Sequence, residues 1–370
     1  PGQVEAMPDP QLLVNLQNLS LDDLSFSSEP MTQLQLGITQ TLPYPGKLGL
    51  RSKVAAKEAD AATQDLNQLR LQLARDVKTL WWNLFFLDRA LALNTQNAVL
   101  LQQFVNIAET RYRVGQGLQQ DLLIAQIEVA ELDNRNIQLR QLRESESARL
   151  NTLLARLPRQ EVHLPATVDE RLAGLPDLND LQERAQTSRP DLASLGYLAD
   201  AAQARVNLAR KDYFPDFKVS LLYGLRDGNN PDGSERTDFA SVLFSMDMPI
   251  FNSSKRGRAV DQRNAEWMNR KYQLTNQRNT VASEVSQAVS DYQNRSRQVA
   301  LIKDEIVPRA RQVVEAMLVS YQVSKVDFGS LVRSQTRLLN LETEYWKAFS
   351  SANQTLAQLE AAVGGEIFND

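Results

Sequence analysis

The chain has 370 residues, with 41 Lys and Arg against 45 Asp and Glu, a formal net charge of −4 at pH 7, and no cysteine. Its basic residues form no block, which gives a nucleic-acid partner no electrostatic support, and the lack of cysteine excludes disulfides, thiolate metal sites and cysteine nucleophiles. No apolar run approaches the roughly 18 residues of a spanning helix, so insertion into a membrane would have to use β-strands.

Two stretches near the N-terminus, residues 10–18 and 31–43, alternate between apolar and polar residues. Alternation with a period of two is typical of a β-strand with two different faces. The polar stretch Ser20–Glu29 connects the two, so the sequence predicts a first β-hairpin.

A long helical tract follows at about residues 47–111, and a returning helix is predicted at about 119–156. At about 1.5 Å per residue the first tract would extend about 100 Å, which exceeds a globular domain. Gly115 and Gly117 lie between the two helices and permit a tight reversal of the chain.

Prolines and the single histidine, His163, mark residues 157–178 as an irregular connection. A shorter helix at about 179–212 leads from this connection to a second pair of alternating strands. The strands contain Phe217–Tyr223 and Val242–Met248, and the segment Asp227–Gly233 between them has a strong turn composition.

The second pair of strands leads into another long helix, at about 254–320, in which Pro308 should cause a kink. A returning helix is predicted at about 329–363, because its small and apolar residues recur three and four apart, as in the seam of a coiled coil. The seam residues are Leu331, Ser334, Leu338, Leu341, Tyr345, Ala348, Ala352, Thr355, Leu359 and Ala362.

The second half of the chain repeats the first. Tyr112–Leu123 is similar to Tyr321–Val332, and Pro8-Asp9 precedes the first strand as Pro215-Asp216 precedes the third. The repeated unit is roughly two hundred residues long, too long for a solenoid module, which predicts two pseudo-symmetric halves of one body. The start of each long helix also matches: Leu42-Pro43 with Lys47 and Gly49 corresponds to Met248-Pro249 with Lys255 and Gly257.

Four strands cannot close a transmembrane barrel, whose lower limit is about eight strands. An open sheet in lipid would leave backbone groups unpaired, so the strands must pair with other copies of the chain. Two copies would give eight strands and three would give twelve. Polar residues on one face favour the wider barrel with a wet lumen; they are Gln33, Gln35, Thr39, Ser241, Ser245 and Asp247.

These residues resemble the TolC-like trimeric outer-membrane efflux proteins, and the match covers essentially the whole chain. It rests on the duplicated order of elements and on four short motifs: Tyr112-Arg113-Val114-Gly115, Tyr321-Gln322-Val323-Ser324, Arg189-Pro190-Asp191 and Ile306-Val307-Pro308. Within the family, the segments Glu29–Thr32 and Leu42–Gly49 look most like the branch that accompanies heavy-metal cation pumps.

The resemblance implies a mainly α-helical chain with a β-barrel part: a homotrimer with a twelve-stranded barrel in the lipid of the outer membrane of a Gram-negative bacterium and an α-helical coiled-coil tunnel in the periplasm. The tips of the tunnel would dock onto a periplasmic adaptor, a membrane fusion protein, fed by an inner-membrane efflux pump. We therefore expect seven segments: a first β-hairpin (1–46), a first helical hairpin (47–157), an irregular connection (158–178), a helix leading to the barrel (179–214), a second β-hairpin (215–252), a second helical hairpin (253–364) and a tail (365–370).

The resemblance also implies two sets of site residues at the helical tips. The adaptor-docking residues are Val114, Gly115, Gln116, Gly117, Leu118, Ser324, Lys325, Val326 and Asp327. At positions where family members often carry acidic side chains, the chain has Ser330 and Arg333, with Asp121 in the first repeat. A periplasmic entrance gate held by Arg333 with Asp121 or Asp327 is a hypothesis, and solvated helix-end charges are the alternative.

No enzyme, cofactor or metal site is expected. The sequence has no glycine-rich phosphate loop between a strand and a helix and no nucleophile–histidine constellation, and His163 lacks a second histidine or a cysteine as a partner. The alternative function is a soluble coiled-coil periplasmic adaptor or scaffold. That function would require the strands to be an ordinary half-buried sheet that faces a core.

Overall fold

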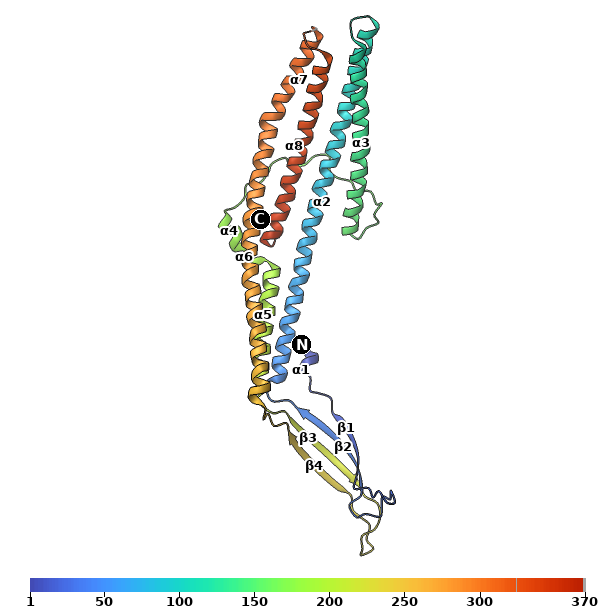
Figure 1. Cartoon of the computed structure of the whole chain (residues 1–370), viewed down its shortest axis with the longest axis vertical. Helices are drawn as coiled ribbons and strands as arrows, with labels where there is room; N and C mark the ends of the chain where they lie inside the picture. The colour runs from blue at the N-terminus through green and yellow to red at the C-terminus, as the bar shows by residue number, and fades with distance from the viewer. Residues whose placement is uncertain (324, 369–370) are drawn as a thin grey trace. The chain divides into compact units, whose positions relative to one another are not determined.

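The computed structural model describes residues 1–323 and 325–368 and shows a mostly helical chain with one four-stranded sheet (Figure 1). The elements are α1 (Gly2–Glu5), β1 (Gln11–Gln17), β2 (Gln33–Leu42), α2 (Lys47–Arg113), α3 (Gln119–Leu153), α4 (Leu178–Ser188), α5 (Pro190–Lys211), β3 (Phe217–Leu225), β4 (Phe239–Met246), the π-helical η1 (Asn252–Gly257), α6 (Arg258–Ala300), the π-helical η2 (Leu301–Ile306), α7 (Val307–Gln322) and α8 (Phe328–Val363).

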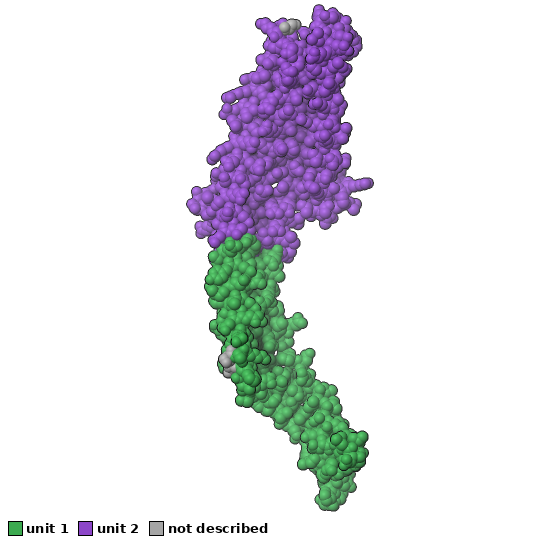
Figure 2. All heavy atoms as spheres, in the orientation of Figure 1, with its two compact units in different colours: residues 1–65, 191–277 green, residues 66–190, 278–370 purple. Residues whose placement is uncertain are grey.

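The chain forms two compact units, coloured separately in Figure 2. The first consists of residues 1–65 and 191–277 and contains the whole sheet. The second consists of residues 66–190 and 278–370 and contains α3, α4, α7 and α8.

In the first unit, the strands form one antiparallel sheet in the order β1-β2-β3-β4. The central pair, β2 and β3, comes from the two copies of the repeat. Its strands run from Leu42 opposite Phe217 to Leu34 opposite Leu225. The strands predicted from the alternating pattern are confirmed, and the two strand pairs join edge to edge into one sheet.

One face of this sheet is apolar and uncovered. Leu12, Ile38, Leu221 and Val242 lie side by side across the four strands and are 77%, 56%, 60% and 75% exposed. A sheet in a water-soluble protein normally packs its apolar face against a core. These four exposures show that no described element of the chain supplies such a core here.

The opposite face carries an amide row at its loop end, formed by Asn15, Gln17, Gln33 and Gln35. Asn15 Nδ2 donates to Gln35 Oε1 (2.9 Å), and the Nε2 atoms of Gln33 and Gln35 both donate to Gln17 Oε1. Gly224 makes room for the row, because a Cβ atom there would lie 2.1 Å from Gln33 Oε1. The other residues of this face are Gln11, Leu13, Gly37, Thr39, Thr41, Lys218, Ser220, Leu222, Phe239, Ser241, Leu243 and Ser245.

In the second unit, the predicted seam of α8 is buried and holds the helices together. Phe349, next to the seam residue Ala348, contacts Trp82 of α2 edge to face, with ring centroids 5.7 Å apart. Most of the seam residues predicted from their spacing are buried: Leu331, Leu338, Leu341, Tyr345, Ala348, Ala352, Thr355 and Leu359.

The prediction of a single helix at 179–212 is wrong, because the chain breaks between α4 and α5. Arg189 adopts an extended conformation (φ −70°, ψ 123°), since the ring of Pro190 disfavours helical backbone at the preceding residue. The Arg189 side chain is only 7% exposed, and its guanidinium pairs with Glu284 of α6 (Nη1 to Oε2, 2.5 Å).

The long helix predicted at 254–320 begins with the π-helical η1 and is interrupted by the π-helical η2. The turn η2 directly precedes α7, whose first turn contains Pro308. Proline has no N–H to donate to the preceding turn, and a π turn is one of the local departures that accommodate such a gap. The disturbance predicted at Pro308 therefore lies just before it in the chain.

Candidate functional site

The first tip, between α2 and α3, has a hydrogen-bond pattern that favours glycine. Gln116 N donates to Arg111 O (2.8 Å) and Gly115 N donates to Tyr112 O (3.0 Å), the two bonds of a Schellman motif. Gly115 has a φ of 75°, a left-handed conformation that costs other residues energy. At Gly117 a Cβ atom would lie 3.0 Å from Arg111 Cβ, so the space there is also tight.

The second tip, between α7 and α8, repeats part of this pattern. Lys325 N donates to Ser320 O (2.9 Å), the same spacing as Gln116 to Arg111. Asp327 then caps α8: its Oδ1 accepts from Ser330 N (2.8 Å) and its Oδ2 accepts from Ser330 Oγ (2.7 Å). Ser324, also predicted to dock the adaptor, lies outside the described residues.

Two of the three predicted entrance residues meet in this cap. Arg333 Nη2 donates to Ser330 Oγ (2.8 Å) and lies 3.7 Å from Asp327 Oδ1. The hydrogen bonds from Ser330, with the charge of Arg333, hold the pKa of the Asp327 carboxyl below its ordinary value. Asp121 lies in the first turn of α3, and within the described chain no ion pair joins it to Arg333. Of the two carboxylates suggested for Arg333, the structure brings only Asp327 close.

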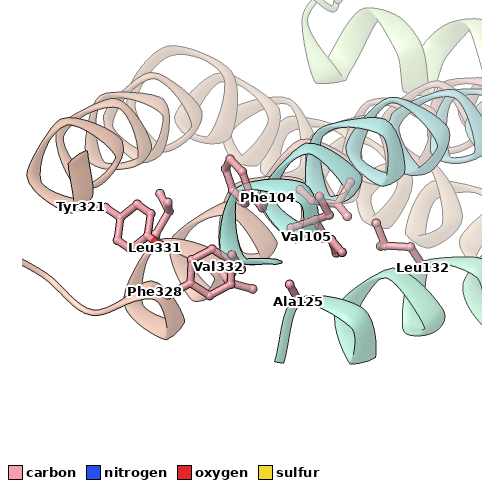
Figure 3. Close-up of a cluster of buried hydrophobic side chains, with 11 residues drawn as sticks. Phe104, Val105, Ala125, Leu132, Tyr321, Phe328, Leu331 and Val332 are labelled. Atoms are coloured by element: carbon pink, nitrogen blue, oxygen red, sulfur yellow. The ribbon is translucent and has the colours of Figure 1, made fainter. Parts of the chain in front are cut away.

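A shared apolar core lies beneath both tips (Figure 3). Phe328 of α8 packs against Tyr321 of α7 and Phe104 of α2, with ring centroids 5.4 Å and 6.3 Å away. The Arg111 guanidinium lies over the Tyr321 ring, 4.5 Å from its centroid. Side chains from α2, α3, α7 and α8 all contribute to this core, so both tips rest on the same packed cluster.

Apolar side chains are exposed on both tips. Val114 and Leu118 of the first tip are 61% and 66% exposed, and Val323 of the second is 60% exposed. Val326, predicted as a docking residue, is half-buried and packs against the core beneath the tips. The sequence reasoning missed Val323, although its place in the Tyr-x-Val motif corresponds to Val114. Exposed apolar tips with fixed backbones suit contact with a protein partner.

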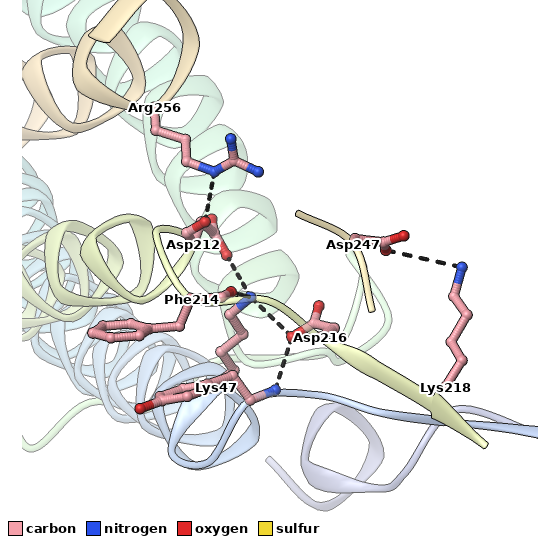
Figure 4. Close-up of polar contacts among 8 residues, drawn as sticks. Lys47, Asp212, Phe214, Asp216, Lys218, Asp247 and Arg256 are labelled. Carbon is pink, nitrogen blue, oxygen red and sulfur yellow. Dashed lines mark hydrogen bonds and ion pairs between the residues drawn. The ribbon is translucent and has the colours of Figure 1, made fainter. Parts of the chain in front are cut away.

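A second polar site lies where strand and helix meet in the first unit (Figure 4). Lys47, at the start of α2, is 3% exposed. Its Nζ lies 2.9 Å from Asp216 Oδ1, 3.3 Å from Asp212 Oδ1 and 3.2 Å from Phe214 O. Tyr44 N also donates to Asp216 Oδ1 (2.8 Å). We call this arrangement the Lys47 joint; sequence reasoning aligned Lys47 and Asp216 with repeat counterparts but assigned them no role.

No metal centre emerges from the described residues, among which no group of three His, Cys, Asp or Glu is placed to hold an ion. His163 and its ion-pair partner Glu161 are both 79% exposed. The same residues include no helix with the length and apolar character needed to cross a bilayer.

Comparison with known proteins gives a consistent result. A family model described as "Outer membrane efflux protein" matches residues 6–156 and 181–365. The fold is similar to that of VceC, an outer membrane protein of Vibrio cholerae, with a TM-score of 0.80 and 16% identity over 99% of this chain and 89% of VceC. A comparison with curated protein sequences finds no match.

Two other solved structures have the same fold. CusC, a protein that folds into a transmembrane channel, gives a TM-score of 0.77 and 16% identity over 98% of this chain and 85% of the CusC chain. The open state of the MtrE outer membrane channel of Neisseria gonorrhoeae gives 0.75 and 16% over 99% of this chain and 82% of its own.

Proposed function

This chain belongs to the outer membrane efflux protein family, and from that premise we propose that it is the exit duct of a tripartite efflux system. The duct passively conducts substrates from an inner-membrane pump and a periplasmic adaptor to the outside. Its sheet lies in the outer membrane and its helical part in the periplasm. The single observation that carries the proposal is the uncovered apolar face of the sheet.

That face fits lipid better than water. The side chains that lie opposite one another across the strands are apolar on this face. The four described above are each more than half exposed: Leu12, Ile38, Leu221 and Val242. The scaffold alternative needs the same residues to face a core, and no described part of the chain covers them. In the wall of a membrane barrel, an apolar face lies against hydrocarbon without exposing apolar surface to water, and the polar face lines the water-filled interior.

The outer edges of β1 and β4 support a homotrimer. Both are edge strands in a sheet of four, and in a bilayer their free N–H and C=O groups must be paired. Three copies of four strands supply twelve, enough to enclose a wet lumen, and the amide row would line it.

The tips are the proposed docking surface for the adaptor. Val114, Gln116 and Leu118 of the first tip and Lys325 of the second are exposed on reversals whose backbones are fixed by hydrogen bonds. Arg333 with Asp327 and Ser330 is the proposed entrance cluster, and Asp121 is its candidate neighbour on α3.

Heavy-metal cations are the proposed cargo of the assembled system, on the likeness of Glu29–Thr32 and Leu42–Gly49 to the branch that serves metal pumps. Deleting the gene for this protein from its native host should then reduce the tolerance of the cells to heavy-metal salts, while their tolerance to organic drugs stays unchanged. Loss of drug tolerance alone would contradict this cargo while leaving the duct itself in place.

Light scattering with detergent correction tests the duct. We expect a molar mass of three chains in detergent, aggregation when detergent is removed, and discrete conductance steps in a planar bilayer. A monodisperse monomer or dimer without detergent would instead support the soluble scaffold.

A further inference from the structure

The Lys47 joint connects the two repeats of one chain. Lys47 belongs to the first repeat and begins α2, whereas Asp212 and Asp216 belong to the second and lie between α5 and β3. The Lys47 ammonium is almost fully buried, and its three oxygen partners lie within 3.3 Å. Burying a charged lysine is unfavourable unless it is paired and hydrogen-bonded. The carboxylates of Asp212 and Asp216 are therefore needed to stabilise the buried Lys47 ammonium.

The repeat supplies a second set of the same groups. Lys255 corresponds to Lys47, and Pro8-Asp9 corresponds to Pro215-Asp216. Four residues before each aspartate stands another acid, Glu5 in the first repeat and Asp212 in the second.

Unlike the first set, this second set is unassembled within the chain. Lys255 and Asp9 are both exposed, and among the described residues neither forms an ion pair. Lys255 lines the same 300 Å³ hollow as Asp216 and Asp247, but neither carboxylate lies within 4.0 Å of its ammonium. The neighbouring Arg256 already donates to Asp212 O (2.7 Å), and Glu5 accepts a hydrogen bond from Ser52 Oγ (2.8 Å).

The unpaired groups lie at opposite edges of the sheet. Asp9 lies two residues before β1, and Lys255 lies in η1, nine residues after β4; β1 and β4 are the two edge strands. With neighbouring strands about 4.8 Å apart, the edges of a four-stranded sheet are about 14 Å apart. An ion pair between Asp9 and Lys255 therefore needs two chains. The strands alternate in direction, so β4 beside β1 of another copy is again antiparallel and brings these two ends together.

We propose that Lys255 of one copy pairs with Asp9 of a second copy, forming between subunits the joint that Lys47 and Asp216 form within each subunit. The proposal rests on the proposed trimeric duct. Around the trimer, joints within chains and joints between chains would alternate at the end of the barrel where strands pass into helices. Glu5 of the second copy stands where Asp212 stands in the Lys47 joint and completes the cluster.

Chemical cross-linking tests the pair directly, because the chain contains no cysteine to interfere. The double variant Asp9→Cys with Lys255→Cys, treated in detergent with a short bismaleimide, should give covalent dimers and trimers on a denaturing gel. Each single variant should stay monomeric on the gel. The matched control is Lys47→Cys with Asp216→Cys, which should link within one chain and give no larger species.

Charge exchange gives a second readout that does not depend on the cross-linker. Lys255→Asp and Asp9→Lys should each lower the temperature at which the trimer dissociates, and the chain carrying both should recover most of the loss. A purely structural role for either residue predicts losses that add instead of cancelling.

The outcomes separate this pair from the duct itself. A trimer by light scattering that yields no linked species, and whose exchanged double variant is as weak as the single variants combined, overturns the pair and leaves the duct standing. A wild-type chain that forms no trimer overturns both.

Discussion

Among single residues, Glu170 ties the irregular connection to the helices of the second unit. Its carboxylate lies 2.9 Å from Lys303 Nζ in η2 and accepts a hydrogen bond from the Tyr345 hydroxyl in α8. Burial alone would raise the pKa of this carboxyl, but the bonds from Tyr345 and Lys303 outweigh it and the net pKa is lowered. Burial and the Glu170 charge raise the pKa of Tyr345, which keeps its hydroxyl protonated as the donor.

We expect Glu170→Gln to make the protein less stable at neutral pH, because glutamine keeps an acceptor but loses the charge that holds Lys303. A lowered folded-state pKa means that the stabilisation is present above the ordinary value of 4.5 and is lost as pH falls through the folded value. The difference between variant and wild type should therefore vanish in acid. Thermal unfolding followed by circular dichroism over a pH series measures it.

The control for this experiment is Glu161→Gln, in the same connection. Its side chain is 79% exposed, so its ion pair with His163 should add little and its removal should change the unfolding temperature little. Equal stability of Glu170→Gln and wild type at neutral pH would show that the contacts of Glu170 do not hold the connection.

The residues of the polar face and of the entrance could be predicted from the sequence, but the contacts between their side chains could not. The polar face was predicted from alternation, whereas the amide row depends on strand register, which sets Asn15 opposite Gln35. The entrance hypothesis left two carboxylates open for Arg333, and only the geometry of the helix cap singles out Asp327.

At the scale of elements, the first tip depends on one backbone conformation. Gly115→Ala should destabilise the protein by about 1 kcal/mol, because a left-handed φ is unfavourable for alanine. Within the described residues, no atom lies within 4 Å of the added Cβ to offer a compensating contact. Hydrogen exchange should localise the effect to the end of α2 and the start of α3.

Gly49→Ala is the matched control for the tip. Gly49 lies inside α2 with open space around its Cα and no positive φ, so alanine should stabilise the helix by roughly 0.5 to 1 kcal/mol. If both substitutions shift stability in the same direction, the conformation of Gly115 does not govern the tip.

Most elements could be predicted because each carries a period that the chain repeats. The apolar residues of the α8 seam recur every three or four residues, and those of the strands recur at every second residue. Both patterns can therefore be recognised without knowledge of the packing. The break at Arg189 could have been predicted from Pro190, because a proline breaks a helix in its interior and is tolerated in the first turn of a new helix. The π turns carry no sequence signal of this kind.

At the scale of the whole molecule, the two faces of the sheet should respond oppositely to charge. Val242 on the apolar face and Ser241 on the polar face are neighbours in β4, and both are exposed. Val242→Arg should impair insertion into the outer membrane, since an arginine facing lipid costs about 2 to 4 kcal/mol near the midplane. Ser241→Arg should insert normally and change conductance instead.

Membrane fractionation with heat-modifiable mobility on gels compares the two variants. Equal insertion of both would mean that the apolar face does not meet lipid. That result would also remove the main support for the duct.

The amide row determines how water would wet the channel wall in the proposed trimer. Carboxamides both donate and accept hydrogen bonds and carry no net charge, so each can replace a water molecule around a passing solute of either sign. A hydrated cation and a hydrated anion would therefore meet similar solvation at this level, in contrast to a ring of carboxylates. The channel wall would therefore not select cargo by charge at this level. In the proposed system, selection of cargo would depend on the inner-membrane pump and the periplasmic adaptor.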